Sequence, residues 1–244
     1  MPDPNLENKT ILVTGAGSGI GRVAATTLAQ HGATVILLGR TSANLESLYD
    51  EIVAANCPEP GIAVLDLATQ DIAELQQLGD VILEQYGKLD GLLHNASILG
   101  DRVPVEHYDV NLWAKVMQVN FNNVCYLTRV LLPLLRQAPA ARAVFTSSSV
   151  GATPRAYWGA YAVSKYAMEG YAKLLAEELD NTSEIKVNIL NPGATRTGMR
   201  AKAYPNEDPN TLIEPGALMP LYLHLLSDAC SDNGATFDRS WLGL

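Results

Sequence analysis

Cysteine and histidine are scarce in this 244-residue chain, and neither occurs in a pattern that binds metal. The three cysteines, Cys57, Cys125 and Cys230, are odd in number and far apart. They therefore give neither a disulfide framework nor the spacing of a metal or redox motif. The four histidines are scattered as well. The sequence predicts no metal site and a reducing, cytoplasmic setting.

Clusters of positive charge and long apolar stretches are also missing. The net charge is −9 and no run of Lys or Arg occurs, which argues against a nucleic-acid partner. The most apolar region, 124–135, is interrupted by Arg129 and Pro133 and is too short to cross a bilayer. The first ten residues are polar, unlike a signal peptide. We therefore expect neither nucleic acid nor a membrane as a partner.

The remaining composition, 48% apolar and 18% charged, is typical of a globular protein, and short apolar runs alternate with helical patterns. Strands are expected near 9–13, 34–38, 62–65, 89–94, 143–146, 184–190 and 235–238. Helices are expected near 22–30, 42–55, 71–86, 108–137, 159–179 and 217–226. This alternation predicts an α/β fold with a doubly wound parallel sheet, helices on both faces, and one domain spanning residues 1–244.

A glycine-rich segment, 14–21, follows the first expected strand and opens the first helix. Glycine lets the backbone approach a pyrophosphate, and a helix N-terminus offers free N–H groups and a positive dipole end. A tight turn without a ligand would use similar residues. The strand–turn–helix context nevertheless favours a dinucleotide site in a Rossmann-type fold.

The end of the second expected strand bears on the choice of dinucleotide. About twenty residues after the glycines, a dinucleotide fold that binds the ribose 2′-hydroxyl places an acid. This chain has Gly39 and then Arg40 at that point. A cation there suits a 2′-phosphate, so the sequence predicts NADP(H) in preference to NAD(H). The alternative is that Arg40 is an ordinary solvated surface residue.

Tyr161 and Lys165 are four residues apart in an expected helix, so both side chains lie on one face. A nearby ammonium favours the phenolate and lowers the pKa of a phenol from its usual value of about 10. Ser148 follows the fifth expected strand, at the sheet edge where open α/β proteins bind ligands. Together these groups suit proton transfer to a carbonyl oxygen. A Tyr and a Lys on an amphipathic helix are also common without any catalytic role.

Taken in order, these motifs resemble the short-chain dehydrogenase/reductase family over about residues 9–240. The resemblance implies a catalytic set made of Asn120, Ser148, Tyr161 and Lys165, in which Asn120 fixes a water that links Lys165 to solvent. It implies cofactor contacts from Gly15, Ser18, Gly19, Ile20, Gly21, Arg40, Asp66, Leu67, Asn95, Ala96, Tyr161, Lys165, Pro192, Gly193, Thr195 and Thr197. Segments 145–151, 158–161, 191–197 and 219–223 resemble, more narrowly, one branch of bacterial oxidoreductases in that family.

Three departures from the family pattern are visible. Ser97 stands where the family usually has glycine, and it adds a side chain beside the end of the fourth strand. Residues 238–240 lack the usual Gly-Gly after the last strand, and Ser18 is not the basic residue of some NADP-preferring members. Arg40 must therefore supply that preference alone.

The sequence thus predicts an NADP(H)-dependent oxidoreductase that acts on a small-molecule carbonyl or alcohol, with Tyr161 as general acid and base. A non-enzymatic NAD(P) sensor is the alternative. The polar segment 195–215 is long for a connection and is expected to be a mobile lid over the substrate, with Tyr157, Trp158 and Met199 as candidate wall residues. Apolar residues surround much of the 159–179 helix, so we expect a homodimer or homotetramer through that helix and the 108–137 helix.

Overall fold

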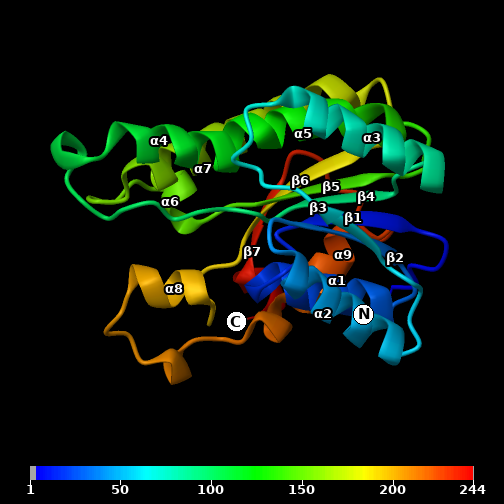
Figure 1. Ribbon diagram of the computed structural model, residues 1–244, viewed down its shortest axis with the longest axis horizontal. Coiled ribbons are helices and arrows are strands. Elements are labelled where there is room, and N and C mark those ends of the chain that lie inside the picture. Colours follow the sequence, from blue (N-terminus) through cyan, green and yellow to red (C-terminus); the bar gives the residue numbers. More distant parts are fainter. Residues whose placement is uncertain (1–3, 244) are drawn as a thin grey trace.

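Seven parallel strands form one sheet in the computed structural model, which describes residues 4–243 (Figure 1). Residues 1–3 of the polar first segment lie outside that range. The strand order is β3-β2-β1-β4-β5-β6-β7. The strands are β1 (Thr10–Thr14), β2 (Thr34–Gly39), β3 (Gly61–Val64), β4 (Gly91–His94), β5 (Arg142–Thr146), β6 (Lys186–Asn191) and β7 (Thr236–Asp238).

Helices cover both faces of this sheet (Figure 1). One layer contains α3 (Ile72–Tyr86), α4 (Val110–Met117), α5 (Asn123–Leu135) and α7 (Gly159–Asp180), and the other contains α1 (Gly19–Gln30), α2 (Ser42–Ala54) and α9 (Met219–Leu225). Two short helices, α6 (Ser149–Ala152) and α8 (Gly198–Ala203), lie at the carboxyl edge of the strands. The expected Rossmann-type, doubly wound architecture is confirmed.

The central strands are buried along their whole length because helices cover both sides of them. Every residue of β1, β4 and β5 is buried, whereas the edge strands β3 and β7 have exposed and partly buried residues in alternation. The chain runs from β1 outward to β3 on one side and then resumes with β4 on the other. This reversal creates the crevice at the carboxyl ends of β1 and β4 where such sheets bind ligands.

Capping residues that can be recognised in the sequence set the helix ends. The Asp71 side chain caps α3 by accepting from the Ala73 amide, and Gly87 ends that helix in the left-handed conformation. The helix expected at 217–226 begins as a 3₁₀ turn, Pro215–Leu218, and becomes α-helical at Met219.

The long helix expected over 108–137 is interrupted. It begins at Val110, after an Asp109 cap, and a π-helical turn at Gln118–Asn122 separates α4 from α5. The break therefore lies before Pro133, through which α5 continues to Leu135. A π turn inserts one extra residue and changes the direction of the side chains in it, and such turns are frequent at functional sites.

The 195–215 segment has more structure than its polar, proline-broken sequence predicts. It contains α8 and a 3₁₀ turn, Pro209–Thr211. Thr195 pairs with Ile213 in a β-bridge, and Arg196 forms an ion pair with Glu214 close by. The expected mobility of this lid stays a prediction. Within the described chain, no helix combines the length and the apolar character needed to cross a membrane.

Candidate active site

Ser148, Tyr161 and Lys165 meet at the carboxyl end of β5. Ser148 is the N-cap of α6, and Tyr161 and Lys165 occupy the first two turns of α7. Only 6% of Tyr161 and 2% of Lys165 is exposed. The Lys165 ammonium donates a 2.7 Å hydrogen bond to the Thr146 carbonyl and lies 5.7 Å from the centre of the Tyr161 ring. The fold therefore brings together the three groups that the sequence selects.

The expected lowering of the Tyr161 pKa by Lys165 is wrong for this structure. Burial raises the pKa of Tyr161 to about 12, and the Ser148 side chain, which hydrogen-bonds the phenol, opposes the rise. Removing the phenol from water disfavours its charged form, and the ammonium is engaged with a backbone carbonyl. Tyr161 is therefore a neutral acid at neutral pH.

Glu169, which the sequence reasoning missed, lies one helical turn beyond Lys165 and is buried. Its carboxylate accepts a hydrogen bond from the Ser147 hydroxyl. Burial lowers the pKa of Lys165 to about 8, and the charge of Glu169 opposes that decrease. The only signal for Glu169 in the sequence is its spacing of four residues from Lys165.

Glu169→Gln tests this electrostatic support. Gln keeps an acceptor for Ser147 but removes the charge that raises the pKa of Lys165. The ammonium should then lose its proton at lower pH, so the alkaline limb of the kcat/KM profile should move down by about 1 pH unit. The measurement is a pH–rate profile beside Glu177→Gln, a charge removal on the exposed part of the same helix. A profile that does not move would show that Glu169 is structural only.

Asn120 lies within the π turn and is almost fully buried. Its side-chain oxygen accepts from the Ile98 amide at 2.8 Å, and its nitrogen donates to the Ile98 carbonyl at 2.9 Å and to Ser164 Oγ at 3.1 Å. Asn120 thus ties the segment after β4 to α7, at the residue before Lys165. Its role in fixing a water stays a prediction.

The glycine-rich turn leaves backbone groups available to an anion. The N-cap Ser18 makes no side-chain capping bond, and the first turn of α1 contains no acid. Gly15 is in the left-handed region, and a Cβ atom there would lie 2.9 Å from the Ala96 backbone. A Cβ atom on Gly21 would overlap the Gly15 carbonyl oxygen. This close-packed cradle and the open N-terminus of α1 fit a pyrophosphate.

The other predicted cofactor contacts on this side line the ends of β1 to β4. Arg40 is exposed and has no carboxylate within 4.0 Å among residues 4–243. One oxygen of Asp66 accepts from the Ala68 amide, and the Leu67 carbonyl accepts from Asn123. The amides of Asn95 and Ala96 both donate to Thr14 Oγ1. The ends of β2, β3 and β4 thus present these groups toward one crevice.

The predicted nicotinamide clamp follows β6. Thr195 donates to the Pro192 carbonyl, and Thr197 caps α8 by accepting from the Arg200 amide. The Thr197 methyl group lies 3.6 Å from the position that a Cβ atom of Gly19 would occupy. The clamp and the glycine-rich turn therefore face each other across the crevice.

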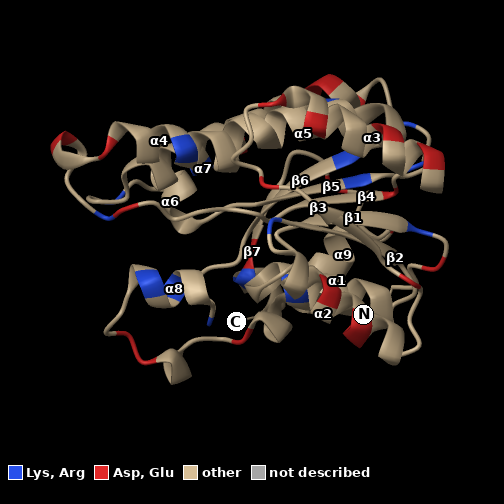
Figure 2. Cartoon of the chain, in the orientation of Figure 1, with Lys and Arg blue, Asp and Glu red and all other residues tan. Residues whose placement is uncertain are grey.

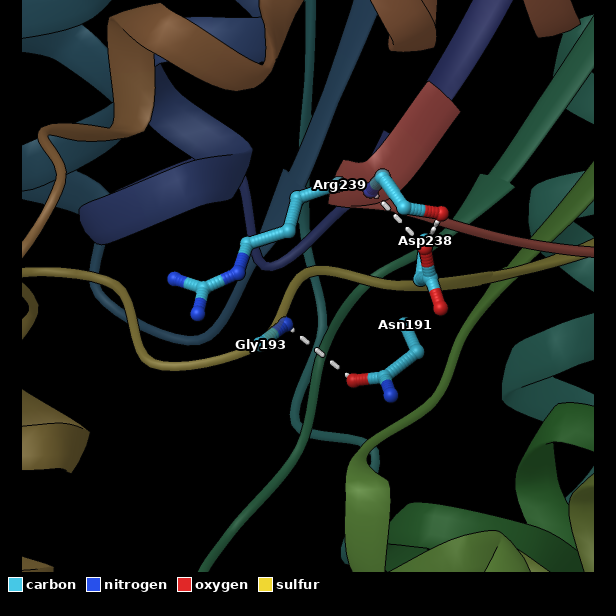
Figure 3. A pocket seen from close by; sticks show the side chains of 5 residues that line it. Asn191, Gly193, Asp238 and Arg239 are labelled. Carbon is cyan, nitrogen blue, oxygen red and sulfur yellow. Dashed lines mark hydrogen bonds between the residues drawn. The ribbon is translucent and has the colours of Figure 1, made fainter. Parts of the chain in front are cut away.

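A cavity of about 180 Å³ opens beside this clamp, at the ends of β6 and β7 (Figure 3). Its lining consists of Asn191, Gly193, Asp238, Arg239 and Ser240. Asp238 accepts from the Ser240 amide and caps a 3₁₀ turn, Arg239–Leu242, in place of the usual Gly-Gly. The Arg239 side chain lies over Gly193 (Figure 3). Residues 238–240, which stand in place of the usual Gly-Gly, thus put the cation of Arg239 beside the clamp.

Ser97 is the other departure with a structural consequence. Its hydroxyl oxygen is buried and has no hydrogen-bond partner within the described chain. Buried polar groups are normally satisfied, so an unpaired hydroxyl just beyond β4 fits a ligand that fills the crevice.

One cluster on the α9 side of the sheet was not predicted. His224, Cys230 and Asp232 bring their possible ligand atoms within 4.8 Å of one another, and the His224 ring stacks on Trp241. The turn after α9 creates this proximity, which scattered positions in a sequence do not reveal. The expectation of no metal site stays a prediction.

A partly buried Ser148 and the buried Tyr161 and Lys165, beside an open phosphate turn, define a nucleotide-dependent oxidoreductase site. A family model described as short chain dehydrogenase matches residues 9–208. The chain therefore belongs to the short-chain dehydrogenase/reductase family. It is similar to the oxidoreductase YciK of Escherichia coli K12, with 49% identity over 234 residues that cover 96% of this chain and 92% of YciK.

Solved structures agree with this placement. A short-chain dehydrogenase of Shigella flexneri complexed with NADP matches with a TM-score of 0.94 and 47% identity, over 98% of this chain and 99% of that one. One of E. coli CFT073 complexed with NADPH matches with a TM-score of 0.94 and 48% identity, over the same shares.

Among relatives compared by sequence, the 3-oxoacyl-[acyl-carrier-protein] reductase FabG of Thermotoga maritima is 33% identical over 200 residues, which cover 81% of this chain and 78% of FabG. The narrower resemblance to a bacterial branch is thus confirmed as a resemblance to YciK.

Proposed function

We propose that this protein is an NADP(H)-dependent oxidoreductase that transfers a hydride between nicotinamide and a small-molecule carbonyl or alcohol, with Tyr161 as general acid and base. The observation that carries the proposal is the grouping of Ser148 with the buried Tyr161 and Lys165 beside the open N-terminus of α1. The NADP and NADPH in the two similar structures support the choice of cofactor.

The chain's own groups handle the proton. NADPH, when bound, supplies the hydride. Tyr161, neutral because burial raises its pKa, gives its proton to the substrate oxygen in reduction and takes it back in oxidation. Ser148 donates a hydrogen bond to that oxygen as negative charge develops. Lys165 holds the nicotinamide ribose and supplies positive charge to the site, while Asn120 positions α7 through Ser164.

The cofactor contacts divide along the crevice. The glycine-rich turn and α1 bind the pyrophosphate, Arg40 binds the 2′-phosphate, and Asp66 with Leu67 contacts the adenine. Asn95, Ala96 and the clamp bind the nicotinamide half. In this proposal one cytoplasmic domain spans residues 1–244.

A screen for NADPH oxidation with aldehydes, ketones, quinones and acyl-thioester ketones tests the proposal. We expect absorbance at the NADPH band to fall with at least one class. Tight NADPH binding with no turnover of any class would instead support a sensor, although a sensor has no need of Tyr161.

The outer face of α7 leads us to propose a homodimer or homotetramer. Val163, Tyr166 and Leu174 on α7 are 45%, 41% and 56% exposed, and Tyr126 on α5 is 38% exposed. Apolar side chains gathered on neighbouring helices indicate an interface. Leu174→Lys should therefore produce monomers in sedimentation velocity at micromolar concentration, whereas Val53→Lys, on α2, should not. A wild-type monomer at that concentration would contradict the proposal.

A further inference from the structure

Arg102 lies at the outer end of the apolar cluster that contains Tyr161. Within that cluster the rings of Trp158 and Tyr161 have centroids 5.6 Å apart. The Arg102 guanidinium lies 4.8 Å from the centre of the Trp158 ring. Trp158 therefore contacts both the Tyr161 ring and the Arg102 guanidinium, so that Arg102 is one side chain away from Tyr161.

The Arg102 guanidinium is held in place and keeps free donors. It lies 4.7 Å from the centre of the Tyr204 ring, and it donates to the Ala203 carbonyl. A guanidinium has five N–H donors, and contacts with rings use its faces and not its edge. The residue is exposed, so the remaining edge is open to a ligand. This arrangement suits carboxylate and phosphate groups, which pair with Arg through two parallel hydrogen bonds.

The charges around Arg102 leave it uncompensated. No carboxylate lies within 4.0 Å of it in the described chain. Arg200, which lies 3.8 Å from the centre of the same Tyr204 ring, is by contrast paired with Glu207. Arg155, before Trp158, and Lys202, on α8, also lack carboxylate partners among residues 4–243. Blue bands mark the cations of α8 in Figure 2. Although the exposed Asp101 precedes it in the chain, Arg102 makes no ion pair with it and can pair with a carboxylate or phosphate of a ligand.

We propose that the substrate carries an anionic group, a carboxylate or a phosphate, apart from its reacting carbon, and that Arg102 binds this group. The inference rests on the proposed function of Tyr161. The open edge of the guanidinium would meet the anion. Arg40 and α1 serve the cofactor phosphates in the proposed function, whereas Arg102 contacts the Trp158 ring that packs on Tyr161.

A matched pair of ligands tests the proposal without turnover. 4-Acetylbenzoate and its methyl ester share the ketone and the benzene spacer and differ in the negative charge. They are titrated calorimetrically into the full-length protein saturated with NADP⁺, which cannot reduce the ketone. One hydrogen bond to a charged group is equivalent to about ten- to a hundredfold in Kd, so the acid should bind at least about tenfold more tightly than the ester.

The variants locate the charge effect. Arg102→Gln should remove the preference for the acid while the Kd of the ester changes by less than about twofold, and Arg102→Lys should keep part of the preference. Lys173→Gln removes an exposed charge from a later turn of α7 and should keep the preference. The NADP⁺ affinity of each variant shows whether it is folded.

Three results would overturn the proposal: equal Kd values for acid and ester in the wild type, no binding of either at millimolar concentration, or an intact preference in both Arg102 variants. The proposed function fails separately. If no substrate class oxidises NADPH but the Arg102-dependent preference is present, the oxidoreductase activity is contradicted and the anion site remains.

Discussion

Tyr161→Phe should lower kcat by about 10²–10⁴-fold, the range that general acid catalysis contributes, with NADPH binding retained. The variant removes the hydroxyl that donates the proton in the proposed function, and it keeps the ring that packs against Trp158. Burial raises the pKa of the phenol to about 12, so Tyr161 is protonated near neutral pH and has a proton to donate. The measurement is kcat with the best substrate of the NADPH screen, together with the NADPH Kd.

Tyr49→Phe, which removes the α2 hydroxyl that donates to Glu59, is the control and should leave kcat unchanged. A Tyr161→Phe enzyme with more than about half of wild-type kcat would show that proton transfer does not use this residue. A parallel loss of NADPH affinity would indicate that the phenol holds the cofactor more than it serves the reaction.

Gly39→Asp combined with Arg40→Ile should reverse the choice of cofactor. Arg40 ends β2 without a carboxylate partner in the described chain, and its charge-assisted hydrogen bonds are available to a 2′-phosphate. Hydrogen bonds to charged groups contribute about 1.5–3 kcal/mol, and about 1.4 kcal/mol is tenfold in affinity. We therefore expect the wild type to bind NADPH about ten- to a hundredfold more tightly than NADH, and the double variant to prefer NADH.

Fluorescence titration of both cofactors, in both proteins, measures this change. Added salt should weaken the wild-type preference, since exposed charges are screened. Arg40→Ile alone should abolish the preference without creating one for NADH, which separates loss of the cation from gain of the acid. Equal wild-type affinities would mean that Arg40 points to solvent, and the fold and the proton-transfer group would be unaffected by that result.

Local sequence signals were sufficient for the architecture. Buried parallel strands are short apolar runs, such as 143–146, and helix ends carry their own chemistry, as Asp71 and Gly87 do. Strand-by-strand alternation with helices then leaves few topologies. The sequence reasoning did not specify the order of the strands; the structure supplies that order and with it the crevice between β1 and β4.

Features that depend on burial and on distant contacts could not be predicted in this way. The π turn at Asn120 depends on hydrogen bonds to Ile98 and Ser164. The pKa of Tyr161 depends on how much water reaches the phenol, and spacing along a helix does not reveal that. Arg102 stands 56 residues before Trp158 in the chain, so nothing local connects the two.

The two ends of the 195–215 segment are joined to each other, which affects how freely the residues between them can change. The bridge between Thr195 and Ile213 and the ion pair between Arg196 and Glu214 join its two ends, so the intervening residues leave and re-enter the protein at one point. Changes in length or composition between those ends therefore leave the strands in register, as in compact surface loops whose ends are close. Residues 205–212, which follow α8 and precede the bridge, can therefore vary while Thr195 and Thr197 of the clamp keep their places.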